Sequence, residues 1–213
     1  MRRESESDVA VRIVDVVVQL LETQGYDAVH LRTVAGLAHV SLARIYKLFH
    51  TRDELIAAAL ERWMTEHAYG EVAPPTPDEP LRDVLIRVLR SVFQPWEQHP
   101  HMLEAYHHAR SGAGGDRLDA HGLSAIMPIA EISLRDLDPE YLEDVAIILP
   151  SMAVALIGQF ASGALEVTEI LPILERTVRR LTADNAAAAA SRTPAGGGLP
   201  HATVSNSLRR AAP

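Results

Sequence analysis

The segment at residues 41–47, SLARIYK, places hydroxyl, guanidinium, phenol and ammonium groups within about two helical turns. Such groups donate hydrogen bonds to anions and to the acceptor atoms of nucleic-acid bases. Arg44 could hold both acceptors on the edge of a guanine, a contact that contributes roughly 1–3 kcal/mol of discrimination between bases. If this segment is a helix, its outward-facing residues are Ser41, Leu42, Arg44, Tyr46 and Lys47.

A second group of chemically active side chains lies between residues 99 and 108. It contains His99, His101, Glu104, His107 and His108. Three of them, His101, Glu104 and His108, have the spacing i, i+3, i+7, which places them close to one helical face. Imidazole and carboxylate ligands would suit zinc or nickel. Histidines that cap helix ends or line a polar pocket are commoner than metal ligands, so we expect neither a metal nor another cofactor.

Catalytic motifs are missing from the sequence. It has no glycine-rich phosphate loop, no Gly-x-Ser-x-Gly elbow and no His-Glu-x-x-His pair. The absence of cysteine excludes disulfides and thiolate metal sites. We therefore expect a binding protein without catalytic residues, and we expect it in the cytoplasm because no secretion signal is visible.

Three helical patterns up to residue 49 would hold the 41–47 segment in place. Apolar residues recur at steps of three and four between Val9 and Leu21, and Gly25 is expected to end this helix in a left-handed conformation. A second helix is expected at residues 31–38. After a turn of about three residues, the Ser41 hydroxyl can cap a third helix that ends near Phe49. The pattern predicts a helix-turn-helix.

The motifs of this region occur in a recognisable order. They are Gly25-Tyr26, Val34-Ala35, Ala38-His39-Val40-Ser41, Ile45-Tyr46, Phe49, Thr51-Arg52 and Glu54-Leu55. This order resembles the DNA-binding head of the tetracycline-repressor (TetR) family of bacterial regulators. The resemblance implies an all-α protein that binds double-stranded operator DNA with an N-terminal three-helix head. It also implies a larger C-terminal helical body that holds a small-molecule effector and forms a homodimer.

The resemblance assigns roles to further residues of the head. Contacts to backbone phosphates are implied for Thr33, Tyr46, Lys47, His50 and Arg52. Two residues depart from the family pattern. His39 replaces the usual turn glycine, so the turn must either avoid a positive φ or adopt it at histidine, which tolerates it more readily than most residues. His30 stands where the family has Ser or Thr at the start of the second helix, which weakens that cap; we keep it among the expected DNA-binding residues.

The remainder of the chain also has helical patterns and no alternating strand pattern. The expected divisions are a helix-turn-helix head at 1–52, a connecting helix at 53–73, a proline-rich loop at 74–80, a ligand-binding and dimerisation domain at 81–184 and a disordered tail at 185–213. Thr51 and Glu54 form the pattern of a capping box for the connecting helix. In the body, one helix should end at Pro95 and another should start at Asp138.

Charge is distributed unevenly between the head and the rest of the chain. Residues 1–52 hold seven Lys/Arg and six Asp/Glu, a balance of +1, whereas residues 53–213 hold 13 and 22, a balance of −9. An acidic body repels DNA and favours docking through the head alone.

The run from Val145 to Phe160 is almost wholly apolar. It is shorter than the ~20 residues of a membrane-spanning helix and contains Pro150, so we expect no membrane insertion but a core or interface helix. The expected dimer-interface residues are Val145, Ile148, Met152, Ala155, Leu156 and Leu174. Periodicity alone does not separate such an interface from internal core.

The effector pocket is expected among amphipathic and soft side chains of the body, each of which could also be ordinary core. The candidates are Trp96, Met102, Tyr106, Met127 and Phe160. This largely apolar set favours a hydrophobic or aromatic effector. The sequence thus predicts a ligand-released repressor; the alternative is a helical metal- or ligand-binding protein whose head docks on protein rather than DNA.

Overall fold

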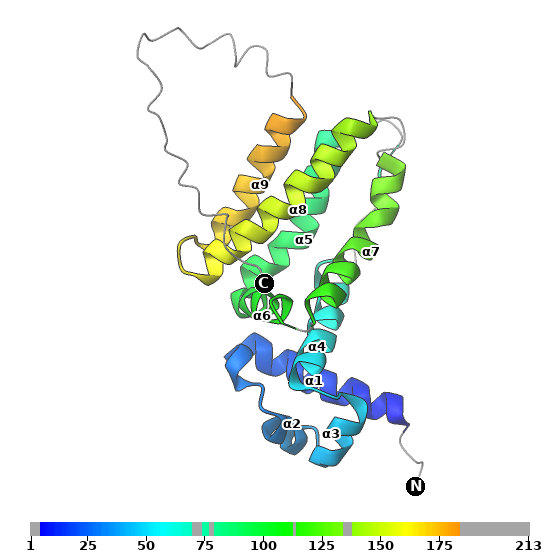
Figure 1. The fold of residues 1–213 in the computed structure, drawn as a ribbon, viewed down its shortest axis with the longest axis vertical. Helices are drawn as coiled ribbons and strands as arrows, with labels where there is room; N and C mark the ends of the chain where they lie inside the picture. The colour runs from blue at the N-terminus through cyan, green and yellow to red at the C-terminus, as the bar shows by residue number, and fades with distance from the viewer. Residues whose placement is uncertain (1–4, 70–73, 77–78, 113, 134–137, 184–213) are drawn as a thin grey trace, which may run out of the picture. The chain divides into compact units, whose positions relative to one another are not determined.

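The computed structural model describes residues 5–69, 74–76, 79–112, 114–133 and 138–183 (Figure 1). Every regular element in these residues is helical, which confirms the all-α prediction. The elements are α1 (Glu6–Gln24), the 3-10 helix η1 (Tyr26–Ala28), α2 (Leu31–Leu37), α3 (Leu42–Leu48), α4 (Arg52–His67), α5 (Leu81–Gln98), α6 (Pro100–Arg110), α7 (Gly115–Ser133), α8 (Pro139–Ala161) and α9 (Val167–Leu181). The tail predicted at 185–213 lies outside the described residues.

Local capping explains where three helices begin. Ser41 caps α3 by accepting a hydrogen bond from the backbone N–H of Arg44 at 3.2 Å. Thr51 caps α4 in the same way, with the N–H of Glu54 at 3.0 Å, and the Asp138 carboxylate caps α8. Each cap satisfies a backbone donor that has no partner within the first helical turn. These three starts follow from the sequence.

Two helix ends differ from the prediction. α4 ends at His67, whereas the connecting helix was expected to reach residue 73. α5 continues through Pro95 to Gln98, although the helix was expected to end at the proline. Proline removes one helical hydrogen bond. Trp96, directly beyond it, is only 3% exposed, so burial of the indole stabilises this last turn in spite of the lost bond.

Gly25 ends α1 as predicted, but in a different conformation. Its φ of 81° is positive, while its ψ of −176° is extended rather than left-handed helical. This combination is essentially restricted to glycine. The backbone therefore turns sharply into η1 instead of closing α1 with a left-handed cap.

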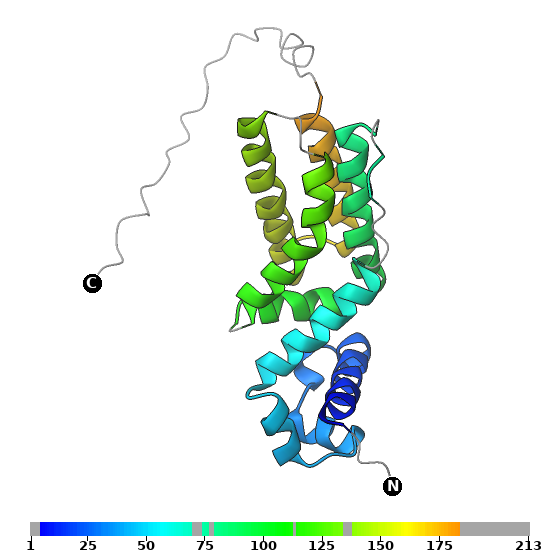
Figure 2. The same cartoon turned by 90° about the vertical axis from the view of Figure 1, so that its right-hand side faces the viewer.

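Helix α4 is shared by the head and the body. It packs against α1 in the head and against α6 and α7 in the body, and Figures 1 and 2 show it running from α3 toward these helices. Its buried side chains, including Leu55, Leu60 and Trp63, belong to the same apolar core as Ile13 and Val17 of α1. In the body, α9 packs on both α5 and α8.

Candidate nucleic-acid interface

The turn between α2 and α3 adopts the backbone conformation that glycine usually supplies. His39 has a φ of 53°. The N–H of Val40 donates to the carbonyl of Ala35 at 3.0 Å, and the side chain of Ala38 is fully buried beside the turn. The turn therefore keeps the positive φ and places histidine there, one of the residues that tolerate it best.

Helix α3 has a buried rear and an exposed front. Ile45 is fully buried and Phe49, directly after the helix, is 9% exposed, so both anchor the helix to the head core. On the other side, 51% of Tyr46 is exposed, as are 61% of the Lys47 side chain and 30% of the Arg44 side chain. Ser41 is exposed and Leu42 half-buried where the helix begins. The structure thus brings these five predicted residues together on one short helix.

Glu6 belongs to the same surface and was not predicted from the sequence. Its carboxylate accepts hydrogen bonds from Lys47 Nζ at 2.6 Å and from Arg44 Nη1 at 3.1 Å. The Lys47 ammonium, followed by the Arg44 guanidinium, holds the pKa of Glu6 below its ordinary value. The pairs span 41 and 38 residues of sequence, so no local spacing indicates them.

The predicted residues on either side of α3 have varied surroundings. His30 begins α2 without a side-chain cap and is exposed, as is Thr33. His50 donates its backbone N–H to the Glu54 carboxylate at 2.9 Å, and its ring Nδ1 lies 3.2 Å from the same oxygen. The expected capping box is therefore incomplete, because Glu54 accepts from His50 instead of Thr51. The backbone hydrogen bond from His50 is the main cause of the lowered pKa of Glu54.

Arg52 has an internal role that the sequence did not indicate. Its Nε donates to the carbonyl of Val29 at 2.7 Å, and its Nη2 donates to the carbonyl of Tyr26 at 2.6 Å. The guanidinium also lies over the Tyr26 ring, 4.3 Å from the centroid. These contacts tie the start of α4 to η1, which favours a structural role for Arg52 over the predicted phosphate contact.

The five predicted pocket residues differ in how deeply they are buried. Trp96 and Met102 are buried in the core, and 41% of Met127 is exposed. Tyr106 and Phe160 are half-buried against the core. The phenol of Tyr106 donates to Asp119 Oδ1 at 3.4 Å, and burial, together with that carboxylate, raises the pKa of Tyr106 to about 12.

A surface hollow of about 350 Å³ lies elsewhere, between α5 and α9. It is lined by Asp83, Ile86, Arg87, Arg90 and Arg179. The arginines have acidic partners: Arg87 pairs with Glu79 at 2.8 Å, and Glu175 pairs with Arg90 at 2.6 Å and with Arg179 at 3.1 Å. None of the predicted pocket residues belongs to this polar hollow.

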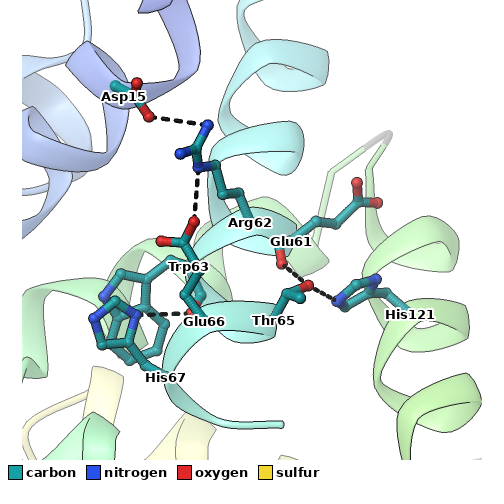
Figure 3. A network of polar contacts seen from close by, with 8 residues as sticks. All are labelled: Asp15, Glu61, Arg62, Trp63, Thr65, Glu66, His67 and His121. Atoms are coloured by element: carbon teal, nitrogen blue, oxygen red, sulfur yellow. Dashed lines mark hydrogen bonds and ion pairs between the residues drawn. The ribbon is translucent and has the colours of Figure 1, made fainter. Parts of the chain in front are cut away.

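Polar contacts tie α4 to the head on one side and to the body on the other (Figure 3). Arg62 pairs with Asp15 of α1 at 3.0 Å. On another face, Glu61 pairs with Arg117 of α7, and Thr65 Oγ1 lies 3.1 Å from His121 Nε2. The Thr65 hydroxyl proton is donated to the carbonyl of Glu61 at 2.8 Å, so the histidine Nε2–H must be the donor to Thr65.

The histidines between residues 99 and 108 contact different neighbours. His99 Nδ1 lies 3.6 Å from Glu22 Oε1, whereas His101 Nδ1 lies 3.5 Å from Glu104 Oε2. His108 packs its ring against Tyr26 at a centroid distance of 5.0 Å. In the part of the chain that the structure describes, no three metal-ligating side chains converge.

Comparison with known proteins gives concordant matches for both halves of the chain. Residues 13–59 match the family model "Bacterial regulatory proteins, tetR family", and residues 79–181 match "Tetracyclin repressor-like, C-terminal domain". No curated protein matches the sequence.

Solved structures share the fold at low sequence identity. A TetR transcriptional regulator from Rhodococcus sp. RHA1 is 16% identical, with a TM-score of 0.63 over 84% of this chain and 99% of that one. A TetR-like transcriptional regulator from the same organism is 22% identical, with a TM-score of 0.56 over 85% and 100%. A TetR family transcription regulator from Marinobacter aquaeolei VT8 is 17% identical, with a TM-score of 0.52 over 86% and 100%.

The helix-turn-helix head, together with the helical body that shares α4 with it, is that of a DNA-binding transcriptional regulator. With both of its halves matched, the chain belongs to the TetR family.

Proposed function

We propose that this protein is a cytoplasmic repressor that binds a palindromic operator as a homodimer and is released by a small hydrophobic or aromatic effector. It acts by binding, without catalysis. The main support is the front of α3, where Arg44, Tyr46 and Lys47 face solvent opposite the buried Ile45 in a helix-turn-helix. A helix of this kind enters the major groove with its N-terminal residues.

Arg44 is the proposed base-reading residue, and Lys47 and Tyr46 are proposed to contact phosphates. Arg44 is the third residue of α3 and lies in its first turn, which the Ser41 side chain caps. A guanidinium presents paired donors that match the two acceptors of guanine, whereas an ammonium acts as a point charge on phosphate. His30, Thr33 and His50 remain proposed contacts of lesser weight.

The dimer interface is proposed to form on α8 and α9. Residues 143–161 of α8 are long and apolar enough to cross a membrane by composition, yet only 22% of this stretch is buried within the chain. Ile147 alone is 57% exposed. A contiguous exposed apolar helix face is typical of a subunit interface, and the family match favours a second copy of the chain over lipid.

The six predicted interface residues differ in how deeply they are buried within one chain. Leu174, Val145 and Leu156 are buried in their own core. Ile148 and Met152 are half-buried and Ala155 is exposed, so the surface offered to a partner is made chiefly by these three and by the exposed Ile147, which was not predicted.

The effector is proposed to bind in the body near Tyr106 and Phe160, the half-buried members of the predicted set. Its binding must favour an arrangement of the heads that does not fit the operator, because a ligand shifts an equilibrium only by its differential affinity. Operator and effector then weaken each other's binding by the same factor. The contacts of α4 with α1 and α7 supply the physical connection.

Fluorescence anisotropy at fixed salt would test the proposal with the DNA that flanks the protein's own gene and a scrambled duplex. Arg44→Ala should reduce the preference for the flanking DNA by about 5- to 150-fold, the equivalent of 1–3 kcal/mol. The control is Arg82→Ala, which removes an exposed arginine near the start of α5, outside the head and the proposed interface. Equal weak binding of both duplexes by the wild-type protein would contradict DNA recognition and favour docking on protein.

A further inference from the structure

The Glu6 carboxylate is hydrogen-bonded to Arg44 and Lys47, the two cationic side chains that the proposed DNA contact requires. The distances of 2.6 Å to Lys47 Nζ and 3.1 Å to Arg44 Nη1 are those of direct, charge-assisted hydrogen bonds. Over half of the Glu6 side chain is exposed, as is that of Lys47. A single carboxylate therefore partly neutralises both cations on the solvent side of α3.

The start of α1 holds this carboxylate in place. Ser5 Oγ accepts from the N–H of Asp8 at 3.1 Å, and the Asp8 carboxylate accepts from the N–H of Ser5 at 3.2 Å. This reciprocal capping box closes the first turn of α1, and Val9 directly after it is buried in the core. Glu6 thus sits on an ordered helical turn, and its contact with α3 joins two fixed elements of the folded head.

A DNA phosphate and the Glu6 carboxylate compete for the same donors. When α3 enters a major groove, Arg44 and Lys47 must exchange the carboxylate for DNA, or else carry it toward the phosphates, where like charges repel. Both routes weaken the binding of any duplex, because the phosphate contribution to affinity does not depend on sequence.

We propose that Glu6 is an intramolecular competitor of DNA that holds Arg44 and Lys47 in the free protein and thereby lowers affinity for every duplex. This inference rests on the proposed DNA-binding function. Operator and random DNA displace the same carboxylate. The free energy of breaking the Glu6 pairs is therefore the same for both duplexes, and it cancels from the difference between their binding free energies. Glu6 therefore sets the strength of DNA binding and its salt dependence while base discrimination stays with Arg44.

The substitution Glu6→Gln tests this role because it removes the charge and keeps a side chain of similar size. Glu97→Gln removes the same charge from the end of α5, outside the head, and serves as the control. Wild type and both variants would be titrated by anisotropy with the flanking and scrambled duplexes at salt concentrations of about 50–200 mM.

Glu6→Gln should bind both duplexes roughly 3- to 10-fold more tightly at the lowest salt, with an unchanged ratio between them. The slope of log K against log salt should steepen, because salt screens the exposed Glu6 pairs of the wild type and so narrows the difference in affinity as the salt concentration rises. The Glu97→Gln variant should match the wild type in both quantities.

Three other outcomes would overturn the inference. Unchanged affinity and slope in Glu6→Gln, with a wild type that recognises the flanking DNA, would remove the competitor role and leave the proposed function intact. Weaker and less selective binding would mean that Glu6 positions Arg44 for base contact. No salt-dependent binding of either duplex by the wild type would refute the proposed function itself.

Discussion

Trp63 offers the sharpest test of how the head and body are joined. It is fully buried on α4, and its indole N–H donates to Glu22 of α1 at 2.8 Å. Its ring lies against Trp96 of α5, with centroids 4.4 Å apart, and stacks on His67 at 4.9 Å. One side chain thus links three helices. We expect Trp63→Phe to destabilise the protein while it still folds.

The size of the expected destabilisation follows from the indole hydrogen bond and the ring volume that phenylalanine lacks. A hydrogen bond to a charged acceptor contributes about 1.5–3 kcal/mol. The Glu22 side chain is 28% exposed, so water can partly replace the indole and the lower part of that range applies. The smaller ring leaves a void next to Trp96, which adds about 1 kcal/mol. The expected loss of unfolding free energy is therefore about 2–3 kcal/mol, a decrease in Tm of roughly 4–12 °C.

Urea unfolding should be followed by far-ultraviolet circular dichroism, because the substitution changes the tryptophan fluorescence itself. Protein concentration must be fixed, since a dimer's apparent stability depends on it. Glu22→Gln is the control: its amide oxygen still accepts from the indole, so a loss below about 1 kcal/mol is expected. The reasoning is refuted if Trp63→Phe unfolds within about 0.5 kcal/mol of the wild type, or if Glu22→Gln costs as much.

Three further predictions concern other parts of the chain. His39→Gly should raise the unfolding free energy by about 0.5–1 kcal/mol and His39→Val should lower it, as measured by thermal melts, because glycine adopts a positive φ without strain. Ile147→Glu should weaken dimerisation by about 100-fold in sedimentation velocity, since it places an unpaired charge where the proposed interface buries an aliphatic group; Leu123→Glu, at a residue of α7 that is 62% exposed, should not. The unfolded chain releases the Tyr106 proton near pH 10 but the folded chain only near pH 12, so stability measured by urea unfolding should fall as pH rises through that interval.

The parts of the head that depend on short spacing could be predicted from the sequence. Ser41 and Thr51 act on backbone donors three residues away, and the buried Ile45 lies one turn before the buried Phe49. These relations depend only on helical geometry, which is the same wherever the helix lies. For the same reason, His39 could be assigned to the turn before its φ was known.

Residues whose roles depend on distant partners could not be assigned in this way. The apolar pattern does not reveal that Trp96 and Met102 fill the core while Met127 faces solvent, because amphipathic spacing gives a helix face and not its neighbour. Pro95 was expected to end α5 because the local rule ignores the burial of the next residue. The hydrogen bonds of Arg52 to the carbonyls of Tyr26 and Val29 likewise have no local sequence signal, because their partners lie 26 and 23 residues away.

The surface of α4 shows why distant partners matter for function. Glu61 and Thr65 lie four residues apart on one face and meet α7, whereas Arg62 and Trp63 meet α1. From sequence alone, a polar i, i+4 pair on a helix is expected to be solvated. Here Glu61 and Thr65 bind α7 of the body from the same turns of α4 whose Arg62 and Trp63 bind α1 of the head. A displacement of α7 would therefore break these pairs or move α4, either against α1 or together with it. These contacts are the physical route by which the proposed effector would act on the DNA-binding surface.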